Sequence, residues 1–314
     1  MTDGTRRELD QDLREFWVQT IAASRELAMP PELVAHNLPV NGLRAFDVRF
    51  SGFGGQRIAA WLIMPEDLST EVPVVIEYVG HGGGRGYAHE HLLWAGAGFA
   101  HFVMDVRGQA SEWSRGDTDD AGPSGPGSGS FFTRGIEHRD RYYYRRLFTD
   151  GILAVDAVHQ ILALRNARVV VTGASQGGGV ALAVASLRDD ISAVMADVPA
   201  FASHRKAIDL VERGPYLEIA QYLAVHRERV EQVFDVLRCF DTMNLVLAAR
   251  APALFSLGGR DDLVAPETIR DVVAAYGGPA ELIEYPFNGH EGGGALHDLV
   301  KVEWLSVAVN SRED

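Results

Sequence analysis

Six short and mostly apolar runs, separated by segments of helical pattern, constrain the fold of this chain more than any other feature. Runs of this kind are typical of strands buried on both faces of a parallel sheet. The runs are Val72–Val79, Ala100–Val106, Ala167–Thr172, Ile191–Val198, Ala253–Leu257 and Ala280–Tyr285. Apolar residues on one face of Leu147–Leu164 predict a crossover helix between the second and third runs. The sequence therefore predicts an α/β fold with a mostly parallel, doubly wound sheet.

Other segments precede or interrupt this alternation. Apolar residues recur at helical spacing from Leu9 to Ile21, and two alternating runs on either side of Gly52–Gly55 predict an antiparallel hairpin. Residues 111–138 include a stretch rich in Gly, Pro, Ser and Asp, and residues 202–249 have a helical pattern without strands. We expect a single domain over 1–314, with an N-terminal helical extension (1–40), a long loop insertion (111–138) and a helical cap insertion (202–249). Loops of such length usually border active sites or interfaces, or are disordered.

Charge and cysteine content exclude several classes of partner. The chain has 43 acidic and 29 basic side chains, a net charge of −14, which repels nucleic acid and anionic membrane surfaces. Its one cysteine, Cys239, cannot form an intrachain disulfide and is expected to be a small buried hydrophobe.

The first residues do not resemble a secretory signal, so a cytoplasmic location is expected. The uncharged run Val169–Leu187 is long enough for a membrane span, but its central glycines favour a strand, a turn and a helix.

The sequence Gly173-Ala174-Ser175-Gln176-Gly177 has the G-x-S-x-G pattern of a nucleophile elbow. In such an elbow, a strained turn between a strand and a helix exposes the serine oxygen. The pattern alone is weak in a chain with 33 glycines, but it follows a strand-like run and precedes an apolar helical pattern. Ser175 is therefore the candidate nucleophile of an acyl-transfer reaction.

A serine nucleophile needs a base, and the base needs a carboxylate that fixes its tautomer. In the chain order serine, acid, histidine, the acid follows a late strand, where Asp261 and Asp262 stand side by side. Their position leaves both open, with a slight preference for Asp261. His290 and His297 follow the acids, and His297 falls in a predicted C-terminal helix. His290, in a glycine-rich loop, is therefore the expected base.

The oxyanion formed during acyl transfer needs two backbone N–H donors. The residue after the nucleophile, Gln176, supplies one, and we expect the other from the glycine-rich stretch Tyr78–Gly84. Histidines 81, 89 and 91 and Glu90 lie in or near this stretch, but no third metal ligand is evident elsewhere. No metal and no cofactor are expected.

Several motifs resemble the acetyl xylan esterase and cephalosporin-C deacetylase family, carbohydrate esterase family 7, which has the α/β-hydrolase fold. The likeness covers nearly the whole chain. The motifs are Arg107-Gly108-Gln109, Gly173–Gly179, His290-Glu291, Val103–Asp105, Thr133–Ile136, Tyr142–Arg145, Asp197–Pro199 and Leu254–Ser256. The resemblance implies Ser175, Asp261 and His290 as the triad, so that it favours Asp261 over Asp262. It also implies the backbone amides of His81 and Gln176 as oxyanion donors.

The chain departs from the family pattern at several positions. It has His81 where relatives commonly have tyrosine, Ala110 where glycine is usual, and Ala265 where proline is usual. These changes affect the expected substrate preference more than the triad. The resemblance implies a cofactor-free hexamer that deacetylates small acetylated sugars and cephalosporins. A broader esterase, a peptidase, an acyltransferase and a non-catalytic binding protein are the alternatives.

Overall fold

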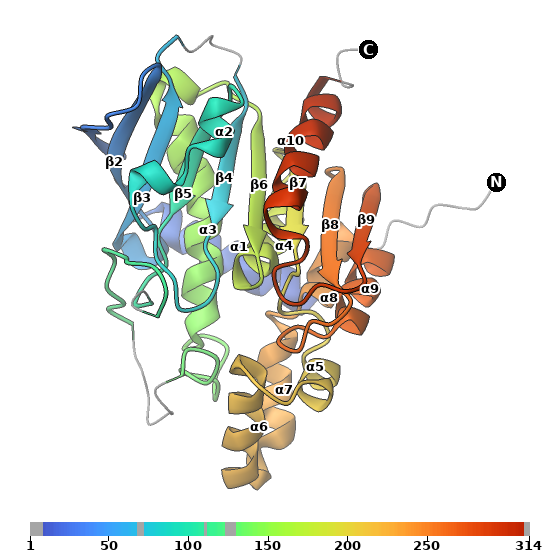
Figure 1. The fold of residues 1–314 in the computed structure, drawn as a ribbon. Helices are drawn as coiled ribbons and strands as arrows, with labels where there is room; N and C mark the ends of the chain where they lie inside the picture. The colour runs from blue at the N-terminus through green and yellow to red at the C-terminus, as the bar shows by residue number, and fades with distance from the viewer. Residues whose placement is uncertain (1–8, 68–71, 110–111, 123–129, 311–314) are drawn as a thin grey trace, which may run out of the picture.

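The computed structural model describes residues 9–67, 72–109, 112–122 and 130–310. Within these ranges, nine strands form one sheet in the order β1-β2-β3-β5-β4-β6-β7-β8-β9 (Figure 1). The strands are β1 (Glu32–His36), β2 (Leu43–Ser51), β3 (Arg57–Pro65), β4 (Val74–Tyr78), β5 (Ala100–Met104), β6 (Val169–Ala174), β7 (Ile191–Asp197), β8 (Ala253–Gly258) and β9 (Ala280–Tyr285). The pairs β1–β2, β2–β3 and β3–β5 are antiparallel, and the pairs from β5 to β9 are parallel. The predicted doubly wound α/β sheet is therefore present.

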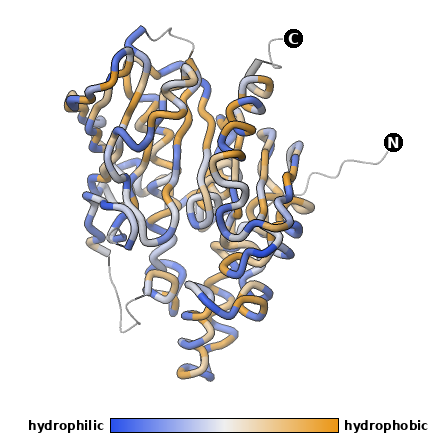
Figure 2. The backbone as a smooth tube through the Cα atoms, viewed as in Figure 1, coloured by the Kyte–Doolittle hydropathy of each residue, from blue (hydrophilic) through white to orange (hydrophobic). Residues whose placement is uncertain are grey.

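Helices cover both faces of this sheet. They are α1 (Gln11–Arg25), α2 (Leu93–Gly96), α3 (Tyr143–Gln160), α4 (Gln176–Leu187), α5 (His204–Leu210), α6 (Pro215–Val225), α7 (Val230–Arg238), α8 (Thr242–Leu245), α9 (Pro266–Ala275) and α10 (Gly294–Asn310). Successive strand residues point to opposite faces, so Val169 and Val171 pack with the main core, which includes α3 and α4. Val170 instead packs with the smaller cluster that α2 and α10 complete. Figure 2 shows the hydrophobic residues that run along the central strands between these layers.

The N-terminal region differs in part from the prediction. Helix α1 begins after Asp10, whose side chain accepts hydrogen bonds from the amides of Asp12 and Leu13. Residues 1–8 of the predicted extension lie outside the described residues. The extension is not wholly helical, because β1 pairs with β2 in its second half. All five residues of β1 are exposed, so the strand has no alternation of buried and exposed side chains that could have revealed it.

The two predicted insertions lie near the carboxyl ends of the parallel strands. Helices α5 to α8 stand between β7 and β8 and extend beyond that edge of the sheet (Figure 1). Residues 112–122 and 130–138 contain neither helix nor strand, and residues 111 and 123–129 of the same predicted loop lie outside the described residues. None of the described helices has both the length and the apolar character that a membrane span requires.

Candidate active site

Ser175 lies in a sharp turn between β6 and α4. Its backbone has φ 56° and ψ −120°, a conformation that is strained for any residue with a side chain. The turn also requires glycine at two neighbouring positions. A Cβ atom on Gly177 would lie 1.9 Å from the carbonyl oxygen of Tyr78, and one on Gly173 would lie 2.4 Å from the carbonyl carbon of Gly177. The flanking glycines thus allow the close packing that a nucleophile elbow needs.

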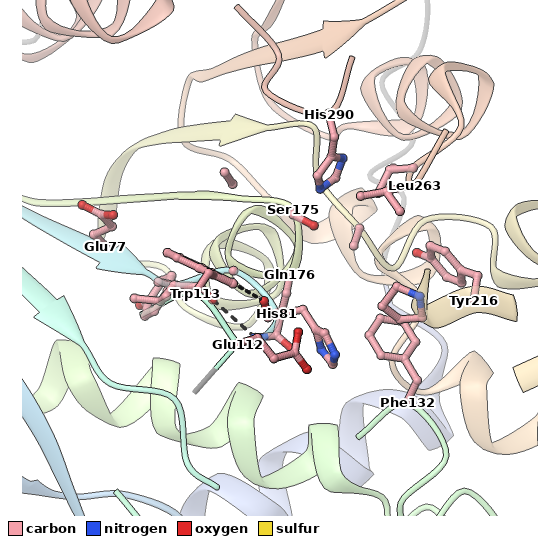
Figure 3. Close-up of a pocket in the computed structure, with 17 residues that line it drawn as sticks. Glu77, His81, Glu112, Trp113, Phe132, Ser175, Gln176, Tyr216, Leu263 and His290 are labelled. Carbon is pink, nitrogen blue, oxygen red and sulfur yellow. Dashed lines mark hydrogen bonds between the residues drawn. The ribbon is translucent and has the colours of Figure 1, made fainter. Parts of the chain in front are cut away.

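His290 and Asp261 lie together beside this turn. His290 Nδ1 is 2.8 Å from Asp261 Oδ2, and the other oxygen of Asp261 accepts hydrogen bonds from the amides of Leu263 and Val264. The carboxylate of Asp261 is therefore fixed on both sides and is fully buried. Figure 3 shows the hydroxyl of Ser175 and the ring of His290 pointing toward each other. The three side chains are arranged as a serine, a base and a carboxylate that orients the base.

The geometry distinguishes the residues that compete for these positions. The side chain of Asp262 is 59% exposed and pairs with Arg213, at 2.5 Å, instead of with a histidine. His297 is buried in α10, where its Nε2 atom lies 3.0 Å from Asp197. Neither residue lines the cavity that contains Ser175.

A cavity of about 460 Å³ opens in front of Ser175. Both parts of the chain that were predicted as insertions contribute to its wall, the loop through Glu112, Trp113 and Phe132, and the helical segment through Pro215 and Tyr216 (Figure 3). The other lining residues are Glu77, Tyr78, Val79, Gly80, His81, Ala174, Ser175, Gln176, Ala200, Leu263, Val264 and His290. The space is therefore walled mainly by apolar and aromatic groups, with the nucleophile and base at its surface.

The two residues predicted to supply the oxyanion donors lie beside this cavity. Gln176 is the first residue of α4, where amide groups have no acceptor within the helix. His81 follows β4, on the loop that faces Ser175, and its carbonyl oxygen accepts a hydrogen bond from Trp113 Nε1 at 2.7 Å. Both residues line the cavity. Their N–H groups are the donors that the sequence predicts, and that assignment stays a prediction.

Gln109 connects the loop that contains His81 with the start of α4. Its Oε1 atom accepts a hydrogen bond from the amide of Gly82 at 2.8 Å, and its Nε2 atom donates to the side chain of Gln176 at 2.9 Å. The hydroxyl of Tyr144 donates to the same Gln176 oxygen. Gln109 and Tyr144 both fall in motifs of the family resemblance, but the sequence assigned them no role. Their contacts identify them as residues that position the oxyanion loop against α4.

The imidazole of His81 is an unusual feature of the cavity wall. Its Nδ1 atom is buried and has no hydrogen-bond partner among the described residues. Burial lowers the pKa of His81, and the negative charge of Glu112 only partly opposes that change. The ring also packs edge-on against Phe132, with the ring centroids 5.4 Å apart. His81 is therefore neutral at neutral pH and supplies a polar but uncharged group to the site.

The histidine-rich stretch near this loop has structural contacts. The side chain of His91 lies 2.9 Å from the carbonyl oxygen of Arg85, and His89 stacks on Tyr87. In the described part of the chain, no group of three or more His, Cys, Asp or Glu side chains is arranged to hold a metal ion.

Comparisons with known proteins identify the family of this chain. The family model for acetyl xylan esterase (AXE1) matches residues 2–308. Acetyl esterase Axe7A of Xylanibacter ruminicola is 23% identical over 203 residues, a match that covers 63% of this chain and 44% of that longer protein. The chain thus spans less than half of that curated relative.

Solved structures extend the likeness to nearly the full chain. Acetyl xylan esterase from Paenibacillus sp. R4 has a TM-score of 0.89 and 30% identity, with 96% of each chain covered. Acetyl xylan esterase 1 from Thermoanaerobacterium sp. JW/SL YS485 has a TM-score of 0.85 and 27% identity, with 94% of each chain covered. The predicted α/β-hydrolase fold and the predicted family are both confirmed. The chain belongs to the acetyl xylan esterase family, carbohydrate esterase family 7, which consists of carboxylic ester hydrolases.

Proposed function

We propose that this protein is a serine esterase that removes acetyl groups from small acetylated sugars. The observation that carries the proposal is the cavity that Ser175 and His290 line together, with Asp261 behind the histidine and the predicted oxyanion residues His81 and Gln176 in the same wall. A nucleophile, a base and oxyanion donors around one space are the parts that acyl transfer requires.

The reaction proceeds in two steps on these residues. In the first, Ser175 Oγ attacks the carbonyl carbon of the ester while His290 takes the hydroxyl proton, and the amides of His81 and Gln176 bind the negative oxygen. The bond to the alcohol then breaks, and His290 gives the proton to the departing oxygen. In the second step, a water molecule loses a proton to His290 and attacks the carbonyl carbon of the acetyl-serine. The bond to Ser175 Oγ then breaks, His290 returns the proton to that oxygen, and acetic acid is released.

A series of aryl esters of increasing acyl length tests the acetyl preference. The match to the acetyl xylan esterase family supports an acetyl preference. We expect kcat/KM to fall from acetyl to butyryl esters and no cleavage of peptide substrates. Equal rates for acetyl and butyryl esters would indicate a broader esterase, and cleavage of peptides would indicate a peptidase. Transfer of acetyl to an added alcohol in preference to water would indicate an acyltransferase.

The substrate range and assembly extend the same proposal. We infer a ring-shaped hexamer whose sites admit acetylated xylo-oligosaccharides and cephalosporin-type acetyl esters but exclude intact xylan. The position of Glu112 and Trp113 at the cavity supports a role for the 111–130 loop in narrowing the entrance. Light scattering measures the assembly, and the ratio of rates on oligomer and polymer measures the size selection. A monomer, or equal rates on both substrates, would remove this part of the proposal.

A cytoplasmic location is the last part of the proposal. It is supported by the single cysteine, Cys239, which is buried and free of disulfide bonds. Fractionation of the producing cells tests it, because the proposal predicts the activity in the cytoplasmic fraction.

A further inference from the structure

The carboxylates among the residues that line the active-site cavity are not balanced by lysine or arginine side chains in the same lining. Among the described residues that line it, two carry a carboxylate, Glu77 and Glu112, and none is lysine or arginine. Glu77 has its own partner, because His101 Nε2 lies 2.8 Å from its carboxylate. Burial alone would raise the pKa of Glu77, but the hydrogen bond and charge of His101 lower it to about 2. The charge of Glu77 is therefore held within an existing pair.

Among the described residues, Glu112 has no such partner. Its backbone amide donates to the carbonyl oxygen of Gly82 at 3.2 Å, which fixes the residue over the oxyanion loop. Its carboxylate lies so close above Gly82 that a Cβ atom there would be 2.2 Å from Oε2. Within the described ranges of the chain, no cationic side chain forms an ion pair with this carboxylate. Figure 3 shows it beside the imidazole of His81, at the cavity.

The neighbouring imidazole does not neutralise Glu112. Burial keeps His81 in its uncharged form at neutral pH, as described above. The charge of Glu112 also reaches Glu218, whose pKa is raised first by burial and then by repulsion from Glu112. The wall of the cavity therefore includes the exposed carboxylate of Glu112, which has no ionic partner among the described residues.

Aromatic rings surround the same space. Trp113, Phe132 and Tyr216 line the cavity, and the hydrogen bond from Trp113 Nε1 to the carbonyl oxygen of His81 fixes the indole. Trp113 is nevertheless 64% exposed, so its ring is accessible to a ligand. Aromatic faces attract cations, and a carboxylate next to them adds direct charge attraction. Anionic groups are repelled by both.

We propose that Glu112 and Trp113 form a cation-binding subsite for the alcohol portion of the substrate. The inference rests on the proposed acetyl esterase function, because an acetyl group is neutral and any charge must lie on the alcohol. The favoured substrates are then acetyl esters of alcohols that carry an ammonium group, such as amino alcohols and amino sugars. Cephalosporin-type esters, which carry a carboxylate, are the poorer substrates of this site.

Three acetyl esters of similar size test the subsite directly. Acetylcholine is cationic, 3,3-dimethylbutyl acetate is its neutral analogue, and 3-sulfopropyl acetate is anionic. At low ionic strength we expect kcat/KM to be about fivefold higher for the cationic than for the neutral ester, and lower again for the anionic one. Glu112→Gln should reduce the cationic preference to within about twofold, and salt at about 1 M should weaken it in the wild type.

Glu231→Gln is the matched control, because it removes the same charge from a side chain that is 82% exposed and outside the cavity. This variant should keep the wild-type order of the three esters. A second measurement needs no variant: choline should inhibit hydrolysis of a neutral aryl acetate competitively and more strongly than 3,3-dimethylbutanol does.

The outcomes separate this inference from the proposed function. If the neutral ester is hydrolysed but the three esters show no charge order, or Glu112→Gln keeps the order, the subsite is wrong and the esterase proposal stands. If none of the esters is hydrolysed, the esterase proposal fails and the subsite fails with it. Equal inhibition by choline and the neutral alcohol would also overturn the subsite.

Discussion

Exchanging each of the adjacent acids for asparagine tests the assignment of the triad carboxylate. Asp261→Asn replaces a buried group whose Oδ1 accepts two amide hydrogen bonds, and asparagine can keep both through its own oxygen. Its NH₂ group would then face His290 Nδ1 in place of an oxygen. The imidazole must accept there, so its proton moves to Nε2, which can no longer receive the proton of Ser175. The fold is kept while the base is held in the wrong tautomer.

The expected losses differ by orders of magnitude. Holding the base in the wrong tautomer lowers kcat by about 10⁴-fold, or roughly 5 kcal/mol of transition-state stabilisation. Asp262→Asn breaks only the exposed pair with Arg213, which solvent screens. Its kcat should therefore fall by less than about fivefold, an amount equivalent to roughly 1 kcal/mol.

Initial rates of p-nitrophenyl acetate hydrolysis by the two purified variants measure the difference. Thermal denaturation of both proteins controls for folding, and Asp262→Asn is the matched control for the loss of one carboxylate. A greater loss in Asp262→Asn, or losses of the same size, would refute the assignment of Asp261.

Three further predictions concern the framework of the site. Gly177→Ala should destabilise the protein by about 1–3 kcal/mol in thermal denaturation, because its methyl group would lie 1.9 Å from the carbonyl oxygen of Tyr78. An unchanged Tm would contradict the packing of the elbow. Asp150→Ala should lower the free energy of unfolding in urea by about 3–5 kcal/mol, because the buried guanidinium of Arg107 loses the carboxylate that accepts two of its hydrogen bonds and retains the longer carboxylate contact with Asp120. Glu77 has a folded pKa of about 2 against 4.5 when unperturbed, so its stabilising contribution is complete above pH 4.5 and is lost as the pH falls toward 2. The Tm difference between wild type and Glu77→Gln should therefore shrink over that range, and a constant difference would contradict the shift.

Burial explains which parts of the fold could be predicted from the sequence. The central strands β4 to β8 are buried in continuous runs, so their apolar pattern located each within a few residues. Strand β1 is held by backbone pairing with β2, while its side chains are exposed to water. A strand of this kind produces no hydrophobic pattern from which it could be predicted. For a related reason, α3 spans Tyr143–Gln160 and not the predicted residues 147–164. Tyr143 and Tyr144 at its start are fully buried, but their polar hydroxyls weaken the apolar pattern.

Some residues of the candidate site could also be predicted from the sequence, and others could not. Chain order and the elbow pattern pointed to Ser175 and His290, because local backbone geometry imposes these signals. The residues Asp261 and Asp262 are neighbours of the same type, and the structure separates them by burial and by the contact of Asp261 with His290. Glu112 was missed altogether, since an acidic residue in an irregular loop reads as a solvated charge until the loop is seen to line the cavity.

Direct detection of the acyl-enzyme tests the central claim, that Ser175 carries the acetyl group between ester and water. The enzyme is mixed with excess p-nitrophenyl acetate, quenched in acid within one turnover, digested and examined by mass spectrometry. Our account predicts the added mass of one acetyl group on the peptide that contains Ser175, and no such adduct in Ser175→Ala. Hydrolysis that continues at the wild-type rate in a folded Ser175→Ala protein, or an acetyl group found on another residue as the turnover intermediate, would contradict it.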